Sequence, residues 1–200
     1  MMRLALASAA ALALSSIAAP ASPVIGRPAP AFTAVDSNGK PHSLGELKGK
    51  TVILEWTNDG CPYVRKQYGS GNMQKVQQDL TAAGAVWLSV ISSAPGKQGY
   101  VNGAEANQLT ASRKAHPTAV LLDPTGTVGR AYDAQTTPHM FVIDKTGVLR
   151  YMGAIDDQAT TDTSTMAGAR NYVREAFGAV SAGKQVAETA TDPYGCSVKY

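Results

Sequence analysis

The stretch Thr51–Lys66, TVILEWTNDGCPYVRK, decides how this chain is organised. It opens with a run of β-branched, aliphatic and aromatic residues, 51–56, which predicts a buried strand. The turn residues NDG at 58–60 end that strand. Cys61 follows, immediately before Pro62, and proline is favoured at the first position of a helix. The sequence therefore predicts a strand, a short turn and a helix that begins at a cysteine.

A cysteine at the start of a helix has distinctive chemistry. The unpaired N–H groups and the positive end of the helix dipole favour the thiolate, which is the nucleophilic form of the side chain. Arg65 and Lys66 in the first turn add positive charge near Cys61, whereas Asp59 acts in the opposite direction. We predict a redox-active Cys61, and the alternative is a structural cysteine bridged to Cys196.

Composition narrows the class of protein. The chain has 200 residues, of which 44% are hydrophobic and 16% are charged, as in one globular domain with a full core. Its net charge of +3 comes without a dense cluster of Lys and Arg, so we predict no nucleic-acid partner. The three histidines and two cysteines have no metal-ligand spacing, and no glycine-rich nucleotide loop follows a strand. We therefore predict no metal and no cofactor.

The N-terminal residues have the pattern of an export signal. Arg3 precedes an apolar, alanine-rich run, and Ala19-Pro20-Ala21 offers a small-x-small cleavage site. The run is too short and too rich in alanine to span a bilayer. We predict a signal peptide at 1–21, no stable membrane insertion after cleavage, and a periplasmic or secreted mature chain. Disulfides persist in such compartments.

The rest of the chain alternates strands and helices. We predict a domain at 22–183 with a short edge strand at 31–35, strands at 85–91 and 118–122, a hairpin at 139–144 and 148–154, and helices at 72–83, 104–114 and 166–182. The strand at 85–91 should lie parallel to 51–56 because a helix connects them. A polar C-terminal tail at 184–200 carries Cys196.

This order of elements resembles the thioredoxin fold in its peroxiredoxin and redoxin branch, which includes the alkyl hydroperoxide reductase/thiol-specific antioxidant proteins and exported thiol-disulfide oxidoreductases. The resemblance rests on four motifs: GRPAPAF at 26–32, SLGELKGKTVILEWT at 43–57, CPYV at 61–64 and TTPHMFVIDKTGVLRYMGAIDD at 136–157. It implies an α/β fold with a central mixed β-sheet flanked by helices. It also implies that Pro138 is cis and that Thr137 and Pro138 flank Cys61.

The departures from the family pattern concern the residues around the cysteine. Thioredoxins carry Cys-x-x-Cys, and here Val64 stands at the second position. Peroxiredoxins keep one cysteine, with a threonine three residues earlier and an arginine near the later strand. Asn58 occupies the threonine position, Thr57 lies one residue away, and Arg130 and Arg150 only approximate the arginine.

Two further residues have alternative roles. Cys196 is a resolving thiol, the permanent partner of Cys61, or a link between chains. His139 follows Pro138, where it either tunes the thiol or is a hydrogen-bonded packing residue. If Cys196 resolves Cys61, the tail folds back over the domain, with Val198 and Tyr200 as apolar anchors, and we expect it to be docked when bridged and looser when reduced.

These residues leave three functions open. A peroxiredoxin-like enzyme would reduce peroxide through Cys61, and a second thiol, Cys196 or an external thiol reductant, would condense with the sulfenic acid. A thiol-disulfide oxidoreductase would act on disulfides of exported proteins through a mixed disulfide. A non-catalytic module would hold a structural Cys61–Cys196 bridge.

Overall fold

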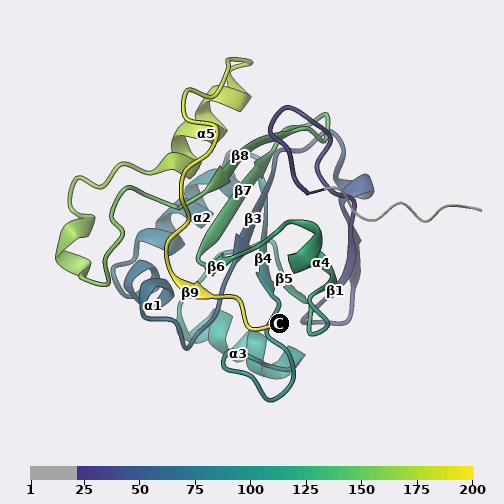
Figure 1. Ribbon diagram of the computed structural model, residues 1–200, viewed down its shortest axis with the longest axis vertical. Helices are drawn as coiled ribbons and strands as arrows, with labels where there is room; N and C mark the ends of the chain where they lie inside the picture. The colour runs from purple at the N-terminus through teal and green to yellow at the C-terminus, as the bar shows by residue number, and fades with distance from the viewer. Residues whose placement is uncertain (1–21) are drawn as a thin grey trace, which may run out of the picture.

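The computed structural model describes residues 22–200, so the predicted signal peptide at 1–21 lies outside the described residues. Seven strands form one sheet in the order β2-β1-β5-β4-β3-β7-β8 (Figure 1). The bounds of the strands are β1 Thr33–Asp36, β2 Pro41–Ser43, β3 Val52–Trp56, β4 Val86–Ile91, β5 Ala119–Leu122, β7 His139–Ile143 and β8 Leu149–Gly153. A separate pair consists of β6, Thr136–Thr137, and β9, Cys196–Ser197.

The sheet is mixed. Strands β3, β4 and β5 are parallel, whereas β1 lies antiparallel to β5, and β7 lies antiparallel to both β3 and β8. The helices are α1 Pro62–Gly69, α2 Asn72–Ala82, α3 Gly103–Ser112, α4 Thr127–Ala131 and α5 Tyr172–Ser181, with short 3-10 turns η1 Leu44–Leu47 and η2 Thr163–Met166. The predicted mixed sheet flanked by helices is confirmed.

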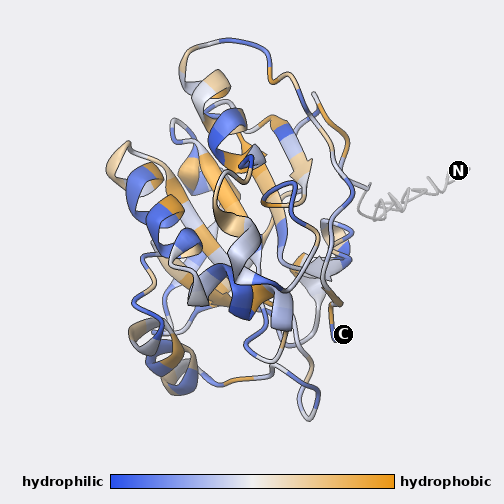
Figure 2. Cartoon of the chain, turned by 90° about the vertical axis from the view of Figure 1, so that its left-hand side faces the viewer, coloured by the Kyte–Doolittle hydropathy of each residue, from blue (hydrophilic) through white to orange (hydrophobic). Residues whose placement is uncertain are grey.

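The two faces of the sheet bury different clusters. One face packs Leu54, Trp56 and Phe141 against α4 and the N-terminal segment. The other packs Ile53, Met140 and Val142 against α1, α2 and α5. Alternation along β3 and β7 sends neighbouring side chains to opposite faces, so both faces are apolar. Figure 2 shows the resulting concentration of hydrophobic residues in the strands of the interior.

A buried carboxylate ties the first two helices to the sheet. Glu55 on β3 is fully buried and accepts hydrogen bonds from Tyr68 of α1 (2.8 Å) and Gln77 of α2 (3.0 Å). Trp87 and Ser89 on β4 also donate to it, at 2.8 and 2.9 Å. Burial nevertheless raises the pKa of Glu55. These bonds fix α1, and therefore the cysteine at its start, relative to the central strand.

Two elements differ from the prediction. The strand at 31–35 was expected at the edge, but β1 lies between β2 and β5. The Asp36 carboxylate accepts the N–H groups of Asn38 and Lys40, and this turn folds β2 back along the outer side of β1. The edge strand on this side of the sheet is therefore β2.

The helix predicted at 166–182 begins only at Tyr172. Gly168 has a φ of +83°, which a continuous α-helix does not allow, and Asn171 is extended where it bridges to Asp156. The Asn171 side chain then accepts the N–H of Arg174 and caps α5. The apolar periodicity was correct for α5 but continued, without a helix, into the preceding loop.

Among residues 22–200, no helix combines the length and the apolar character needed to cross a membrane.

Candidate active site

Cys61 caps the N-terminus of α1 with an extended backbone (φ −83°, ψ 122°), and Pro62 is the first helical residue. The Arg65 N–H donates to the Cys61 carbonyl at 2.9 Å, which closes the first turn of the helix. The predicted strand, turn and cysteine-led helix are therefore confirmed. The side chain of Cys61 has no exposed surface, and its thiol donates a hydrogen bond to the carbonyl oxygen of Thr137, 3.0 Å away.

The segment across from Cys61 contains the expected cis proline. The Thr137–Pro138 bond is cis, as predicted. Thr137 is buried, and its carbonyl faces the sulfur of Cys61. Thr137 and Pro138 thus flank the cysteine, although they come from a segment far along the chain.

The C-terminal tail brings the second cysteine to the same place. Strand β9 pairs antiparallel with β6, so that Cys196 lies opposite Thr137 and Ser197 opposite Thr136. In Figure 1 the tail runs from the end of α5 to β9, beside β6. Cys196 is partly exposed and packs against the cluster that buries Cys61.

Both anchors predicted for the tail are in place. The Val198 N–H donates to Gln135 at 3.0 Å, and the Tyr200 hydroxyl donates to the Ala134 carbonyl at 2.8 Å. Both cysteines are free thiols in this docked arrangement. The tail is thus docked without a disulfide, and the expectation that it is looser when reduced than when bridged stays a prediction.

The two thiols lie close enough to shift each other's pKa. Burial raises the pKa of Cys61, but interactions with the Cys196 thiol and with the backbone N–H of Val64 outweigh it, and the pKa lies below its ordinary value. Burial and the neighbouring Cys61 raise the pKa of Cys196, which the Lys199 ammonium partly offsets. Cys61 is therefore the thiol that ionises first, and Cys196 stays protonated beside it.

Asn58, in the position of the family's threonine, builds the loop that leads to the cysteine. Its Oδ1 accepts the Gly60 N–H at 2.8 Å, its Nδ2 donates to the Gln98 carbonyl at 3.3 Å, and its own carbonyl accepts the Cys61 N–H at 3.1 Å. These bonds occupy its amide, so Asn58 supports the position of Cys61 through the backbone.

The hydroxyl of Thr57 faces a different space. Thr57 lines a cavity of about 20 Å³ together with Tyr68 and Arg113, and its buried Oγ1 has no hydrogen-bond partner among the described residues. A cavity of that size holds about one water molecule. Cys61 is not among the residues that line it.

The basic residues are engaged elsewhere. Arg65 is exposed and donates to the Asp59 carbonyl at 2.8 Å, while the Asp59 carboxylate pairs with Arg113. Arg150 pairs with Asp144 at 2.6 Å. Arg130 lies over the ring of Tyr200, 4.6 Å from its centroid. The described contacts thus bring none of the predicted arginines to the Cys61 sulfur.

His139 lies on the opposite face of the sheet from the cluster that contains Cys61. It pairs with Trp56 across β3 and β7, and its ring lies 4.5 Å from that of Phe141. Its Nδ1 accepts the Gln135 N–H at 3.3 Å. Burial lowers the pKa of His139 to about 4, so the ring is neutral near pH 7. The structure places His139 as a hydrogen-bonded packing residue.

Sequence reasoning missed the side chains that hold the tail. Tyr194 binds between Gln67 and Asp156, and Thr191 binds Tyr151 and the Ala154 N–H. The tail is polar, and its turn motif Pro193-Tyr194-Gly195 was the only signal that pointed to Tyr194. Within residues 22–200 no three histidine, cysteine or acidic side chains are grouped as metal ligands.

The geometry defines a thiol site of the thioredoxin class, with a cysteine at a helix start facing the residue before a cis proline. The chain belongs to the AhpC/TSA family, whose model matches residues 25–152, more than half of its length. Family membership makes it an oxidoreductase of the redoxin type. The tail with Cys196 lies beyond the matched residues.

Solved structures show the same fold at low sequence identity. An uncharacterized conserved protein from Geobacillus kaustophilus is 22% identical, with 88% of this chain and 92% of that chain covered and a TM-score of 0.75. A hypothetical protein from Sinorhizobium meliloti 1021 is also 22% identical, with coverages of 90% and 96% and a TM-score of 0.75. The thioredoxin domain of a thiol-disulfide oxidoreductase from Bacteroides vulgatus is 21% identical, with coverages of 74% and 97% and a TM-score of 0.52. No curated protein matches the chain by sequence.

Proposed function

We propose that the protein is an exported thiol-disulfide oxidoreductase in which Cys61 and Cys196 form the redox couple. The observation that carries this proposal is the register of β6 with β9. Cys196 pairs with Thr137, and the Thr137 carbonyl accepts the Cys61 thiol. The chain's own tail therefore supplies the second thiol that a Cys-x-x-Cys helix would supply at Val64.

The reaction follows from the two pKa shifts. Cys61, which ionises first, attacks one sulfur of a substrate disulfide, and the other substrate sulfur leaves as a thiolate. The product is a mixed disulfide at Cys61. Cys196 then loses its proton and attacks the Cys61 sulfur, which releases the second substrate thiolate. The substrate disulfide gains two electrons, and the enzyme is left with a Cys61–Cys196 bridge that an external thiol reductant must reduce.

Access to Cys61 requires the tail to move, because its side chain is completely buried. Loss of the β6–β9 pairing would uncover the sulfur and the edge of β6 together. An extended segment of a substrate protein can add to such an edge through main-chain hydrogen bonds. Docking of the tail would then both exclude the substrate and complete the internal disulfide.

Peroxide reduction is the second candidate, and the AhpC/TSA match together with the single cysteine at the start of α1 favours it. It would use the same two thiols: Cys61 becomes a sulfenic acid, and Cys196 condenses with it and releases water. Against it, Asn58 is bonded within its loop and Thr57 faces another cavity.

The proposal that the protein is exported rests on the sequence pattern of residues 1–21.

One experiment tests the couple and separates the two substrates. The reduced mature chain is treated with one equivalent of oxidised glutathione or of hydrogen peroxide, and the peptides are mapped without reduction. We expect a peptide that links Cys61 to Cys196, formed faster with the disulfide. Faster formation with peroxide would favour the second candidate, and no linked peptide with either oxidant would overturn the couple.

A further inference from the structure

Tyr194 is bound in a buried polar socket between the tail and the domain. Its hydroxyl donates to the Asp156 carboxylate and accepts the Gln67 amide N–H, 3.3 Å away. Its ring lies 5.7 Å from that of Tyr63, and the Lys66 ammonium lies 5.3 Å from its centroid. The socket is therefore complementary to both the hydroxyl and the face of a tyrosine.

The socket is itself fixed by hydrogen bonds. Gln67 has no exposed surface. Its side-chain Nε2 donates to the Asp156 carboxylate at 2.6 Å, and its side-chain Oε1 accepts a hydrogen bond from Asn72 at 2.6 Å. Asp156 is 1% exposed and also accepts the Gln158 N–H at 2.9 Å. Burial and the Asp156 charge raise the pKa of Tyr194, so its hydroxyl keeps the proton that it donates.

Three of the socket residues lie on the helix that presents the catalytic thiol. Tyr63, Lys66 and Gln67 are all in α1, and Cys61 is the residue that caps α1. Tyr194 is separated from Cys196 only by Gly195. Both the socket and Cys61 are therefore attached to α1, and the residue that enters the socket is only two positions from Cys196.

Gly195 leaves little freedom between the socket and Cys196. Its φ is +145°, and a Cβ at this position would lie 2.1 Å from the Thr137 carbonyl oxygen. The tail backbone thus contacts β6 on one side while the Tyr194 side chain enters the socket on the other. Seating of Tyr194 and placement of Cys196 are geometrically coupled.

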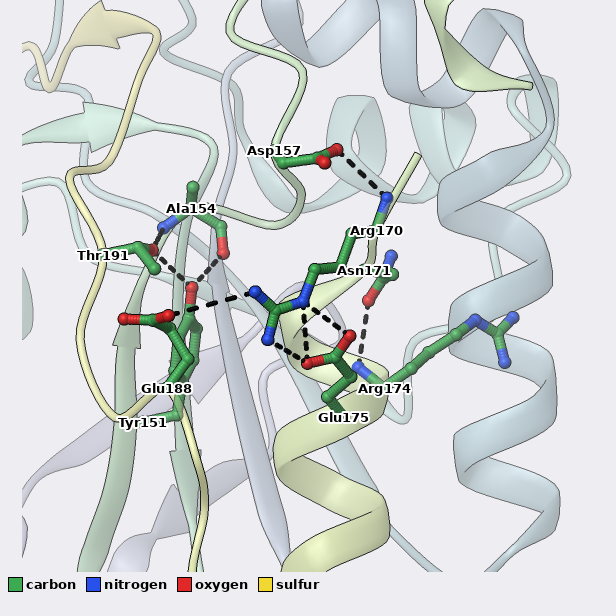
Figure 3. Close-up of polar contacts among 9 residues, drawn as sticks. All are labelled: Tyr151, Ala154, Asp157, Arg170, Asn171, Arg174, Glu175, Glu188 and Thr191. Atoms are coloured by element: carbon green, nitrogen blue, oxygen red, sulfur yellow. Dashed lines mark hydrogen bonds and ion pairs between the residues drawn. The ribbon is translucent and has the colours of Figure 1, made fainter. Parts of the chain in front are cut away.

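The other anchors of the tail involve different elements. Figure 3 shows Thr191 bound to Tyr151 and to the Ala154 N–H, and Glu188 beside Arg170. Tyr200, after β9, contacts Arg130 and Ala134 near α4. Among the tail side chains of the described chain, Tyr194 alone is hydrogen-bonded to α1.

We propose that Tyr194 is a positioning residue that latches the tail onto the Cys61 helix, so that the latch sets both access to Cys61 and delivery of Cys196. This inference rests on the proposed redox couple. With the latch closed, Cys61 is covered and Cys196 is held against it. This raises the effective concentration of the Cys196 thiol at the Cys61 sulfur. With the latch open, Cys61 meets a substrate or an external thiol.

The test measures opening directly, without the disulfide. In full-length protein with Cys196→Ser, Cys61 is the remaining cysteine, and iodoacetamide reaches it only when the tail opens. The labelling rate then reports the equilibrium of opening. Tyr194→Phe keeps the ring but removes a hydrogen bond to a carboxylate, so we expect labelling to be about tenfold faster. The matched control is Tyr132→Phe, which removes the hydrogen bond from a buried tyrosine hydroxyl to the Pro30 carbonyl, an acceptor in the N-terminal segment and not in the tail.

A second variant approaches the latch from the socket. Asp156→Asn should also speed labelling, and the double variant with Tyr194→Phe should be no faster than the faster single variant, because both remove one interaction. Thermal unfolding of each variant shows that the fold is retained. The latch would be overturned if Cys61 were labelled as slowly in Tyr194→Phe as in the Tyr132→Phe control. It would also be overturned if the effects of Tyr194→Phe and Asp156→Asn on the labelling rate were additive in the double variant. Failure to form the linked peptide in the unmodified protein would instead overturn the redox couple.

Discussion

Thr137 and Cys196 are register partners in the antiparallel pairing of β6 with β9. Because the carbonyl of Thr137 also accepts the thiol of Cys61, one residue contacts both cysteines of the chain. Thr137 precedes a cis proline, and the buried backbone of this segment contacts the start of α1 on one side and the tail on the other. The β6–β9 pair therefore brings the second thiol to the first, although Cys61 and Cys196 are 135 positions apart in the sequence (196 − 61).

The first prediction concerns the roles of the two thiols. Cys61→Ser should reduce exchange with oxidised glutathione to the uncatalysed rate, because the thiol of lowered pKa is lost. Cys196→Ser should instead accumulate a mixed disulfide at Cys61, because no internal thiol resolves it. Mass spectrometry of the intact variants distinguishes these states. Accumulation of the mixed disulfide on Cys196 in the Cys61→Ser variant at the unmodified rate would contradict this assignment.

The local part of the site could be predicted from the sequence. Strand, turn and helix around Cys61 follow from short-range rules, since Pro62 begins a helix and the residues before it form a strand and a turn. The resemblance to a family then correctly implied the cis bond at Pro138. Each of these features depends on neighbouring residues or on a motif.

The long-range part could not be predicted in the same way. Tyr194 and Asp156 are far apart in the sequence, and neither lies in an apolar pattern that indicates burial. A polar tail has no periodicity to show which side chain enters the domain. The same limitation explains α5, where apolar residues before Tyr172 resembled a helix but Gly168 and the bridge at Asn171 prevented one.

The second prediction concerns the pKa of Cys61. Interaction with the Cys196 side chain is one cause of its lowered pKa, after the opposing effect of burial. Serine at 196 retains a hydroxyl that can donate to the thiolate, whereas alanine does not. Cys196→Ala should therefore have a higher Cys61 pKa than Cys196→Ser, measured from the pH dependence of thiolate ultraviolet absorbance. Equal titration curves would show that the side chain at 196 does not stabilise the thiolate.

The third prediction concerns acid stability. His139 has a pKa of about 4 in the folded chain, lowered by burial from the ordinary value of 6.5. Above pH 6.5 the ring is neutral in both states, but as the pH falls towards 4 only the unfolded chain takes up the proton, so stability is lost over this window. The loss amounts to about 3 kcal/mol.

His139→Asn keeps an acceptor for the Gln135 N–H and removes this titration. Its free energy of unfolding should therefore fall less than that of the unmodified protein between about pH 7 and about pH 4. Urea unfolding at several pH values measures the difference. His116→Gln, at an exposed histidine, is the control and should follow the unmodified protein. Equal pH dependence of all three proteins would show that His139 is not held neutral by burial.

The fourth prediction concerns the close contact between the tail and β6. Gly195 has a φ of +145°, and a methyl group there would meet the Thr137 carbonyl oxygen at 2.1 Å, so Gly195→Ala cannot keep the present pairing of β9. The control is Gly178→Ala in α5, where a Cβ would meet no atom within 4 Å. Replacing a helical glycine by alanine should stabilise the fold by about 0.5–1 kcal/mol.

Gly195→Ala should instead expose Cys61, so that iodoacetamide labels Cys61 faster in the Cys196→Ser background. Urea unfolding of the same variant should show that the rest of the domain remains folded. If Cys61 stays as protected in Gly195→Ala as in Gly178→Ala, the β6–β9 pairing is not what covers the thiol.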